Sequence, residues 1–471
     1  MDPTGLSLAQ LAAAVREGAI SAREVVSAHL ERSHRLQPDL NAYTLIDDGA
    51  LARAEVLDRG RRSGESLGLL AGVPIGLKDL IDQAGLPTTC GSSFYRQVPD
   101  HPATVVERLE EAGAVIVGRT GLHEWAFGFS SENPWWGPVR NPWNLAASPG
   151  GSSGGSGAAV AARLAAGAIG TDTGGSVRVP AALCGVVGLK VSHGRIPLTG
   201  VFPLAPSLDT VGPLGRSVED VELLYLAMAG PDPSDPWSAA RPVEEASTPA
   251  RLEGLPIGIP QPWVDGTAVA GDVREAFRAA LNRLADHGAD LRELVDPTMV
   301  PPGRSVAIIN AEAASVHRHW FPSRAEEYGR ELAERLAETQ EITLDDYLDA
   351  QAWRSGLRQA AARAFAEVEF LITPATAVSV KLIGEDLIEV EGKAHHYRRL
   401  LSSFSSLVNH MGNPALVLPL AWEGEPAPGL QIVGPRWGER RLLGLGRALE
   451  EAGLVEVKEP PEAGDPYRPK R

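Results

Sequence analysis

The pattern of apolar and polar positions predicts helices and strands that alternate along most of the chain. Residues 7–10 and 21–24 each have the form of a capping box, so two helices are expected within the first forty residues. Residues 270–370 carry mostly helical patterns, and 442–452 is expected to form a last helix. Short apolar runs predict four strands, at 114–118, 186–189, 370–373 and 415–418. Such alternation favours an α/β fold.

Irregular segments divide this pattern. Residues 133–155 are rich in Pro, Trp, Ser and Gly, and a long irregular segment inside an enzyme is more often a functional loop than a linker. The mostly Ala and Gly stretch from Ser156 to Ala168 suits a thin helix buried against a sheet. Residues 232–250 are polar and predict an exposed connector, and the proline-rich tail, 461–471, is expected to be loosely held.

Composition excludes several classes of protein. Hydrophobic residues make up 44% of the 471 positions, enough for a sizeable core, and a net charge of −16 disfavours binding to nucleic acid. Cys90 and Cys184 suit a reducing compartment, although a disulfide between them stays open, and neither lies in a Cys-x-x-Cys zinc pattern. Neither a signal peptide nor a membrane span is predicted, so a cytoplasmic location is expected.

The densest chemical signal is the segment 148–185, in which two serine–glycine clusters flank the small-residue helix. Glycine lets main-chain amides approach a ligand closely. The turn Thr173-Gly174-Gly175-Ser176 could therefore aim several N–H groups at one point, which is the requirement of an oxyanion hole. A serine in the same turn would be the natural nucleophile.

Three other interpretations of the serine–glycine clusters were weighed. Such runs are commonly flexible loops. A phosphate-binding loop of the Walker type needs a lysine after the last glycine, where this chain has Ser156. Residues 150–154 match the G-x-S-x-G elbow of α/β-hydrolases, but that elbow follows a buried strand, and the prolines and asparagines of 141–149 do not predict one.

The chain resembles the amidase signature family. Ser152 and Ser176 stand 24 positions apart, as they do in that family, and the resemblance extends over about residues 5–455. Six segments carry it: 72–79, 150–155, 172–180, 185–190, 207–213 and 429–435 (GVPIGLKD, GGSSGG, DTGGSVRVP, GVVGLK, SLDTVGP and GLQIVGP).

The resemblance implies the architecture. A central mixed β-sheet covered by helices on both faces is expected, in a single domain spanning 1–460. Within this domain the parts are N-terminal helices at 5–60, a catalytic core at 65–220, and a helical insertion with the C-terminal part of the sheet at 250–455.

The resemblance also implies the catalytic groups. Ser176 takes the place of the nucleophile, Ser152 that of a bridging serine after a cis Gly151–Ser152 peptide, and Lys78 that of the base. A base must be neutral, and burial lowers the pKa of a lysine. Ala126 matches a substrate contact, as does Ser152. The main-chain amides of the oxyanion hole are those of Thr173, Gly174, Gly175 and Ser176. The family needs no metal or cofactor.

Several neighbouring residues are interpreted as supporting ones. Asp172 and Arg178 are expected to brace the glycine turn as a pair, and Ser153 to support the loop by hydrogen bonding. The histidines are treated as ordinary residues rather than as members of a triad; those considered were His123, His193 and His410.

The expected activity is hydrolysis of small carboxylic amides through a Ser176 acyl-enzyme, with release of ammonia or a small amine. The aromatic loop 125–130 offers apolar surface and no evident charged partner for free glutamine, so neutral aryl or alkyl amides are the predicted substrates. The alternative within the family is the glutamine-hydrolysing A subunit of a tRNA-dependent amidotransferase. A catalytically dead binding protein is disfavoured by the intact Lys78, Ser152 and Ser176. A homodimer is left open.

Overall fold

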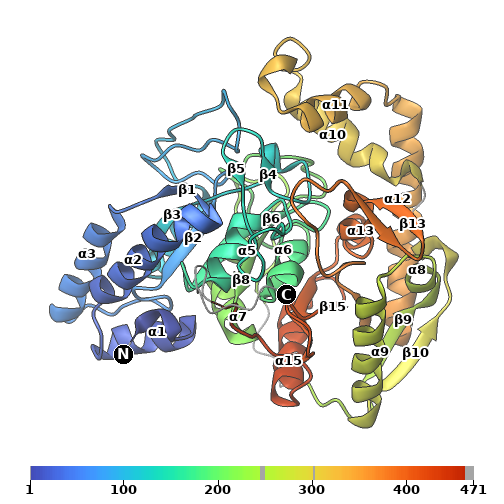
Figure 1. Cartoon of the computed structure of the whole chain (residues 1–471). Helices are drawn as coiled ribbons and strands as arrows, with labels where there is room; N and C mark the ends of the chain where they lie inside the picture. The colour runs from blue at the N-terminus through green and yellow to red at the C-terminus, as the bar shows by residue number, and fades with distance from the viewer. Residues whose placement is uncertain (1, 244–249, 301–302, 462–471) are drawn as a thin grey trace.

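A mixed β-sheet runs through the molecule from one end to the other (Figure 1). The computed structural model describes residues 2–243, 250–300 and 303–461. Within these ranges the main sheet has eleven strands. In spatial order they are β1 (Tyr43–Ile46), β3 (Val115–Thr120), β2 (Pro74–Lys78), β6 (Gly167–Asp172), β8 (Thr210–Gly215), β7 (Val187–Lys190), β14 (Ala415–Pro419), β15 (Gly429–Val433), β11 (Phe370–Pro374), β9 (Pro256–Pro260) and β10 (Asp290–Leu294).

Two parallel strands bring distant parts of the sequence together. β2 pairs with β6 in parallel, with Ile75 opposite Gly167, so both strands end at the same edge of the sheet. β6 continues in antiparallel pairing with β8, where Asp172 lies opposite Thr210. Every residue of these three strands is buried, because helices cover the sheet on both sides.

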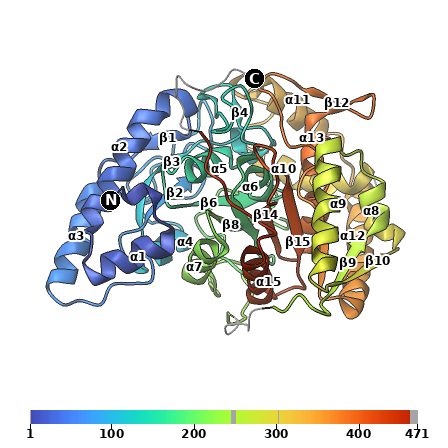
Figure 2. The ribbon, with the colours of Figure 1, turned by 60° about the horizontal axis from the view of Figure 1, so that its bottom comes forward.

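Helices cover both faces of the central strands (Figure 2). α5 and α6 contact each other on one side, and α7 and α15 contact each other on the other. The α-helices are α1 (Leu8–Glu17), α2 (Ala22–Leu40), α3 (Ala50–Arg62), α4 (Thr104–Glu111), α5 (Gly154–Ala161), α6 (Arg178–Cys184), α7 (Val218–Met228), α8 (Gln261–Asp265), α9 (Gly271–Asp286), α10 (Ala307–His317), α11 (Arg330–Thr339), α12 (Leu344–Glu367), α13 (Tyr397–Ser402), α14 (Ser406–Met411) and α15 (Glu439–Glu451).

Several short elements complete the fold. They comprise two hairpins and five single turns of 3-10 helix within the described residues: β4 (Glu132–Asn133) with β5 (Gly137–Pro138), β12 (Leu387–Val390) with β13 (Lys393–His396), and η1 (Pro3–Gly5), η2 (Glu124–Ala126), η3 (Pro297–Met299), η4 (Gly303–Val306) and η5 (Ala325–Glu327).

Most elements expected from the pattern are confirmed. Both capping boxes form, through Ser7 with Gln10 and Ser21 with Glu24, and the four predicted strands are β3, β7, β11 and β14. The small-residue helix was predicted too long. It ends at Ala161, Arg163 takes a φ of 59°, and Ala168 already belongs to β6. The Ala and Gly residues continue from α5 into β6, because small side chains on both elements let the helix lie close to the sheet.

The prediction of an exposed connector at 232–250 was wrong in part, and its residues 244–249 lie outside the described residues. Asp235 is buried and accepts a hydrogen bond from the Leu198 N–H at 2.8 Å, so this part of 232–250 is fixed to the core. Of the predicted loose tail, 462–471 lies outside the described residues. Cys90 and Cys184 are both buried and free, so no disulfide joins them. Among the helices that the structure describes, none is both long and apolar enough to cross a membrane.

Candidate active site

Lys78, the last residue of β2, is a fully buried amine. Its Nζ donates hydrogen bonds to Ser152 Oγ at 2.7 Å and to Thr171 Oγ1 at 2.8 Å. Both acceptors are hydroxyl groups, and no carboxylate among the described residues forms an ion pair with it. Burial lowers the pKa of Lys78 to about 7, although Asp172 and Asp209 oppose the shift. A substantial fraction of this lysine is therefore neutral near pH 7.

The main chain around Ser152 is held on both sides. The peptide between Gly151 and Ser152 is cis, as the resemblance implies. The Ser152 carbonyl accepts hydrogen bonds from the His123 N–H at 3.1 Å and from Ser131 Oγ at 3.3 Å. Gly151 packs against the backbone of the neighbouring loop so closely that a Cβ would lie 2.8 Å from Ser130 N. This position therefore requires glycine.

The turn that carries Ser176 is fastened to the C-terminal half of the chain. Ser405 Oγ donates to the Gly174 carbonyl at 2.6 Å. Gly175 has a φ of 134°, and a Cβ there would lie 2.1 Å from Ser405 Oγ, so a larger residue is excluded. The Gly175 N–H donates to Asp172 Oδ1 at 2.9 Å. Of the four amides expected in the oxyanion hole, that of Gly175 is thus already engaged, and those of Thr173, Gly174 and Ser176 remain candidates.

Asp172 and Arg178 form the predicted pair. Their side chains are fully buried and lie 2.9 Å apart. Arg178 also donates to Gln431 Oε1 at 2.7 Å and Asn409 Oδ1 at 2.6 Å, while Asn409 Nδ2 donates to Asp172 Oδ1 at 2.8 Å. Burial alone would raise the pKa of Asp172, but the Arg178 charge outweighs it and holds the pKa below its ordinary value. These contacts support the turn, as the sequence interpretation expected.

Ser153 joins the two serine loops. Its N–H donates to the Ser176 carbonyl at 3.2 Å, and its hydroxyl both donates to the Thr171 carbonyl and accepts from the Thr171 N–H. Its side chain is thereby committed to main-chain partners. Ser153, which follows Ser152 in the chain, thus links the serine bonded to Lys78 with the turn that carries Ser176.

The comparisons with known proteins show the family of the chain. The family model described as Amidase matches residues 24–443. The chain belongs to the amidase signature family.

Similar proteins within that family have different activities. The A subunit of the glutamyl-tRNA(Gln) amidotransferase of Chromohalobacter salexigens is 37% identical over 96% of this chain and 98% of its own length. A solved structure described as an amidase is 33% identical, covers 95% of this chain and 99% of its own, and has a TM-score of 0.86. A chain from a vestigial protein complex, described as revealing the origins of an s-triazine catabolic enzyme, is 32% identical over 96% of this chain and all of its own, with a TM-score of 0.90.

The aromatic loop 125–130, which the family resemblance assigns to substrate contact, is partly buried within the protein. Trp125 and Ala126 take left-handed φ values of 53° and 60° and are buried. The ring of Trp125 packs inside an aromatic cluster of Phe94, Tyr95, Phe202, His317, Trp320 and Tyr328. Phe129 lies closest to the Ser176 turn, since its ring is 3.3 Å from the position of a Cβ on Gly174.

Charged residues that sequence reasoning missed lie beside this loop. The guanidinium of Arg335, on α11, stacks 3.6 Å from the centre of the Phe127 ring and also donates to the Phe127 carbonyl. Glu331, one turn earlier on α11, accepts from Tyr397 Oη at 2.9 Å and pairs with Arg398 at 3.3 Å. The loop itself contained no signal for them, because α11 lies about two hundred positions further along the chain.

The histidines behave as ordinary residues, as expected. His123 contacts the serine loops through its main chain, whose N–H donates to the Ser152 carbonyl, while its side-chain Nδ1 lies 3.5 Å from Ser130 Oγ. Burial lowers the pKa of His123 to about 4. Burial lowers the pKa of His193 to about 4 and that of His410 to about 3. All three are therefore neutral near pH 7, and no described contact joins their side chains to Ser152 or Ser176.

Proposed function

We propose that the chain hydrolyses carboxamides through an acyl-enzyme on Ser176. Neutral Lys78 accepts the proton of Ser152, which accepts the proton of Ser176, and Ser176 Oγ forms a bond to the carbonyl carbon. The amides of Thr173, Gly174 and Ser176 stabilise the oxyanion. When the carbon–nitrogen bond breaks, the same relay returns the proton to the departing ammonia. Water, deprotonated through the relay, then releases the acid and restores Ser176.

One observation carries this proposal: the buried amine of Lys78 donates to two hydroxyls and, within the part of the chain that the structure describes, to no carboxylate. A lysine that only stabilises a fold is usually paired with an acid or reaches solvent. A lysine with a pKa of about 7 that donates to a serine hydroxyl can instead exchange protons with it.

For the substrate we propose a carboxamide that carries charged groups, with glutamine as the first candidate. Arg335 and Glu331 lie beside the loop 125–130 and supply the opposite charges that an α-carboxylate and an α-amino group need. The prediction of neutral amides rested on the lack of such partners. The amidotransferase relative supports the same substrate, and in this role the ammonia would pass to a partner protein.

A free-standing amidase is the second candidate. It is favoured by the solved amidase of similar fold and by the apolar ring of Phe129 over the Ser176 turn. Neutral aryl or alkyl amides would then be the substrates, and Arg335 would only support Phe127.

The experiment compares kcat/KM for ammonia release from glutamine, benzamide and butyramide, with the chain alone and with candidate partner proteins. We expect glutamine to be preferred by about tenfold or more. Arg335→Gln should raise KM for glutamine about tenfold and change KM for benzamide by less than about threefold, because only glutamine has a carboxylate that would lose its charged partner. Arg330→Gln, on the exposed side of α11, is the matched control. A preference for the neutral amides would instead establish the free-standing amidase.

A further inference from the structure

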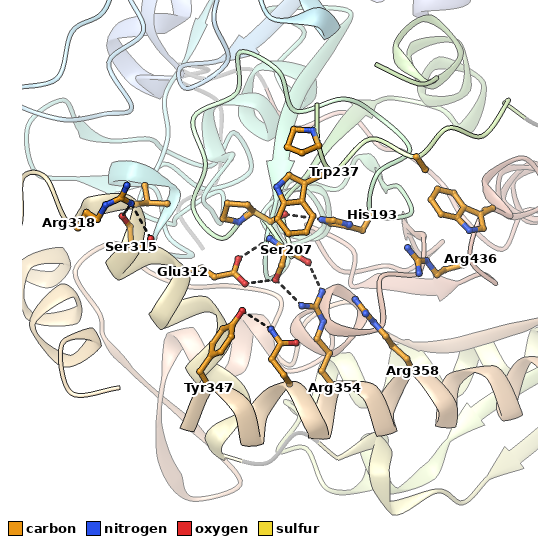
Figure 3. A pocket seen from close by; sticks show the side chains of 16 residues that line it. His193, Ser207, Trp237, Glu312, Ser315, Arg318, Tyr347, Arg354, Arg358 and Arg436 are labelled. Carbon is orange, nitrogen blue, oxygen red and sulfur yellow. Dashed lines mark hydrogen bonds between the residues drawn. The ribbon is translucent and has the colours of Figure 1, made fainter. Parts of the chain in front are cut away.

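A cavity lies apart from the serine loops, between α10, α12 and the loops around residues 193, 207, 237 and 436 (Figure 3). It has a volume of about 750 Å³, and neither Lys78 nor Ser152 nor Ser176 lines it. Cavities of this size hold small organic ligands. The proposed hydrolysis of amides uses none of its residues.

Three arginines meet in this cavity: Arg354 and Arg358, one turn apart on α12, and Arg436 from the loop before α15 (Figure 3). Arg354 is only 4% exposed. Burial, together with the Arg358 charge, lowers the pKa of Arg354 to about 10. Burial and Arg436 likewise lower the pKa of Arg358. All three guanidiniums remain charged at neutral pH, and they repel one another.

Carboxylates offset these charges only in part: Glu312 acts on Arg354 and Glu439 on Arg436, and burial has the larger effect on the pKa of both arginines. Within the described ranges, none of the three arginines forms an ion pair. Arg354 donates to Ser207 Oγ at 2.8 Å and to the Ser207 and His410 carbonyls at 2.5 and 3.2 Å, which are all neutral acceptors. Arg358 has one bond, to the His410 carbonyl at 3.3 Å. The nearby Glu312 directs its carboxylate at Ser207, accepting from its N–H at 2.9 Å and its hydroxyl at 2.5 Å.

Such a concentration of positive charge is unlike the rest of the molecule, whose net charge is −16. Partly desolvated charges without ion-pair partners are costly, and a bound anion lowers that cost. A phosphate monoester carries nearly two negative charges and three oxygens on one centre, which suits several guanidiniums that converge. A single carboxylate brings one charge and two oxygens.

The cavity also has room beyond the arginines. Trp237 lines its opposite side, with 43% of its surface exposed, and stands edge-on to His193 at 5.5 Å. An exposed indole ring offers a surface for a flat apolar group. We propose that this cavity binds a small phosphate monoester, with the phosphate on Arg354, Arg358 and Arg436 and its organic group against Trp237.

The test uses phenyl phosphate, inorganic phosphate and succinate, titrated into the full chain by calorimetry at constant ionic strength in chloride. Phenyl phosphate should bind saturably with one site per chain, and equally well to Ser176→Ala, since the cavity lies outside the proposed catalytic site. Arg358→Gln and Arg436→Gln should each weaken binding about tenfold or more. Arg354 is left intact because its three bonds hold the fold. Arg62→Gln, which removes an exposed charge far along the sequence, should bind as wild type.

Trp237→Ala separates the two parts of the ligand. It should weaken phenyl phosphate and leave inorganic phosphate unchanged, and equal effects on both would overturn the role of the ring. Three results would overturn the phosphate site itself: no saturable binding at millimolar concentration, unchanged affinity in both arginine variants, or tighter binding of succinate.

Discussion

Two buried lysines in neighbouring parts of the sheet have almost the same pKa but different partners. Lys78 ends β2 and Lys190 ends β7, and burial lowers the pKa of each to about 7. Lys78 donates to the hydroxyls of Ser152 and Thr171. Lys190 donates to the carbonyls of Val191 and Asn413, at 2.9 and 2.8 Å.

The difference lies in what the acceptors can do with a proton. A hydroxyl both accepts and donates, so a proton can move from Ser152 to Lys78 and another can follow it. A carbonyl only accepts, and Lys190 therefore fixes the chain near the Asp172–Arg178 pair without any route for proton transfer. A lowered pKa alone does not identify a catalytic base, and the chemistry of its partner decides.

The largest expected effect tests whether the proton route from Lys78 through Ser152 leads to a nucleophile, Ser176. Ser176→Ala should lower kcat for amide hydrolysis by about 10⁴-fold or more, because the acyl-enzyme cannot form. Ammonia release measures the loss, and an unchanged melting temperature shows that the fold is kept. A serine-directed covalent inhibitor should label Ser176. Labelling of Ser152 together with an active Ser176→Ala variant would falsify the assignment.

The next effect separates the lysines directly. Lys78→Met should lower kcat by about 10²- to 10⁴-fold, the contribution of a general base. Lys190→Met keeps Lys78 and both serines, so kcat of the folded variant should stay within about fivefold of wild type. Both are measured on the preferred amide at pH 8. Equal losses in the two variants would mean that burial, and not the hydroxyl partner, matters.

The pH dependence of activity sharpens the same distinction. Only neutral Lys78 can accept a proton, so kcat/KM should rise about tenfold per pH unit below pH 7 and level off above it. The Lys190→Met profile should keep this ionisation, whereas the residual activity of Lys78→Met should lack it. A flat wild-type profile between pH 5.5 and 8 (roughly the range in which a pKa near 7 is visible) would contradict the role of Lys78.

The smallest expected effect concerns stability, where the two lysines should behave alike. Each has a folded-state pKa of about 7, below its ordinary value of 10.5, so between these values the unfolded chain binds more protons. The free energy of unfolding should therefore rise with pH from about 7 to about 10. Urea unfolding at several pH values measures the slope, and each Met variant should reduce it. A slope that both variants leave unaltered would show that neither lysine is buried uncharged.

The local parts of the site could be predicted from the sequence. Lys78, Ser152 and Ser176 lie in glycine-rich segments where residue type and spacing are informative together, and the Asp172–Arg178 pair lies within one turn of chain. The capping boxes and four of the strands were likewise contained in short patterns. β8 and β15 were missed as strands because glycine, proline and glutamine interrupt their apolar runs.

The remaining contacts depend on tertiary structure. Ser405 lies in a serine-rich segment, Asn409 on α14 and Gln431 on β15, and none of these local patterns indicates a contact with the Ser176 turn or the Asp172–Arg178 pair. Arg335 and Glu331 come from a helix whose pattern predicts only an amphipathic surface. Arg354 and Arg358 likewise give no signal in the sequence, since α12 carries charges along its whole length, and Arg436 comes from a loop far along the chain.

The fastening of the Ser176 turn by late segments of the chain has a consequence for synthesis on the ribosome. Ser176 is made early, but Ser405, Asn409 and Gln431, which hold its turn and the Asp172–Arg178 pair, are added more than two hundred residues later. A nascent chain that already includes Lys78, Ser152 and Ser176 thus still lacks the residues that hold the Ser176 turn in place. If the proposed function holds, hydrolytic activity should begin only when the second half has emerged and folded, and a chain truncated before residue 431 should release no ammonia.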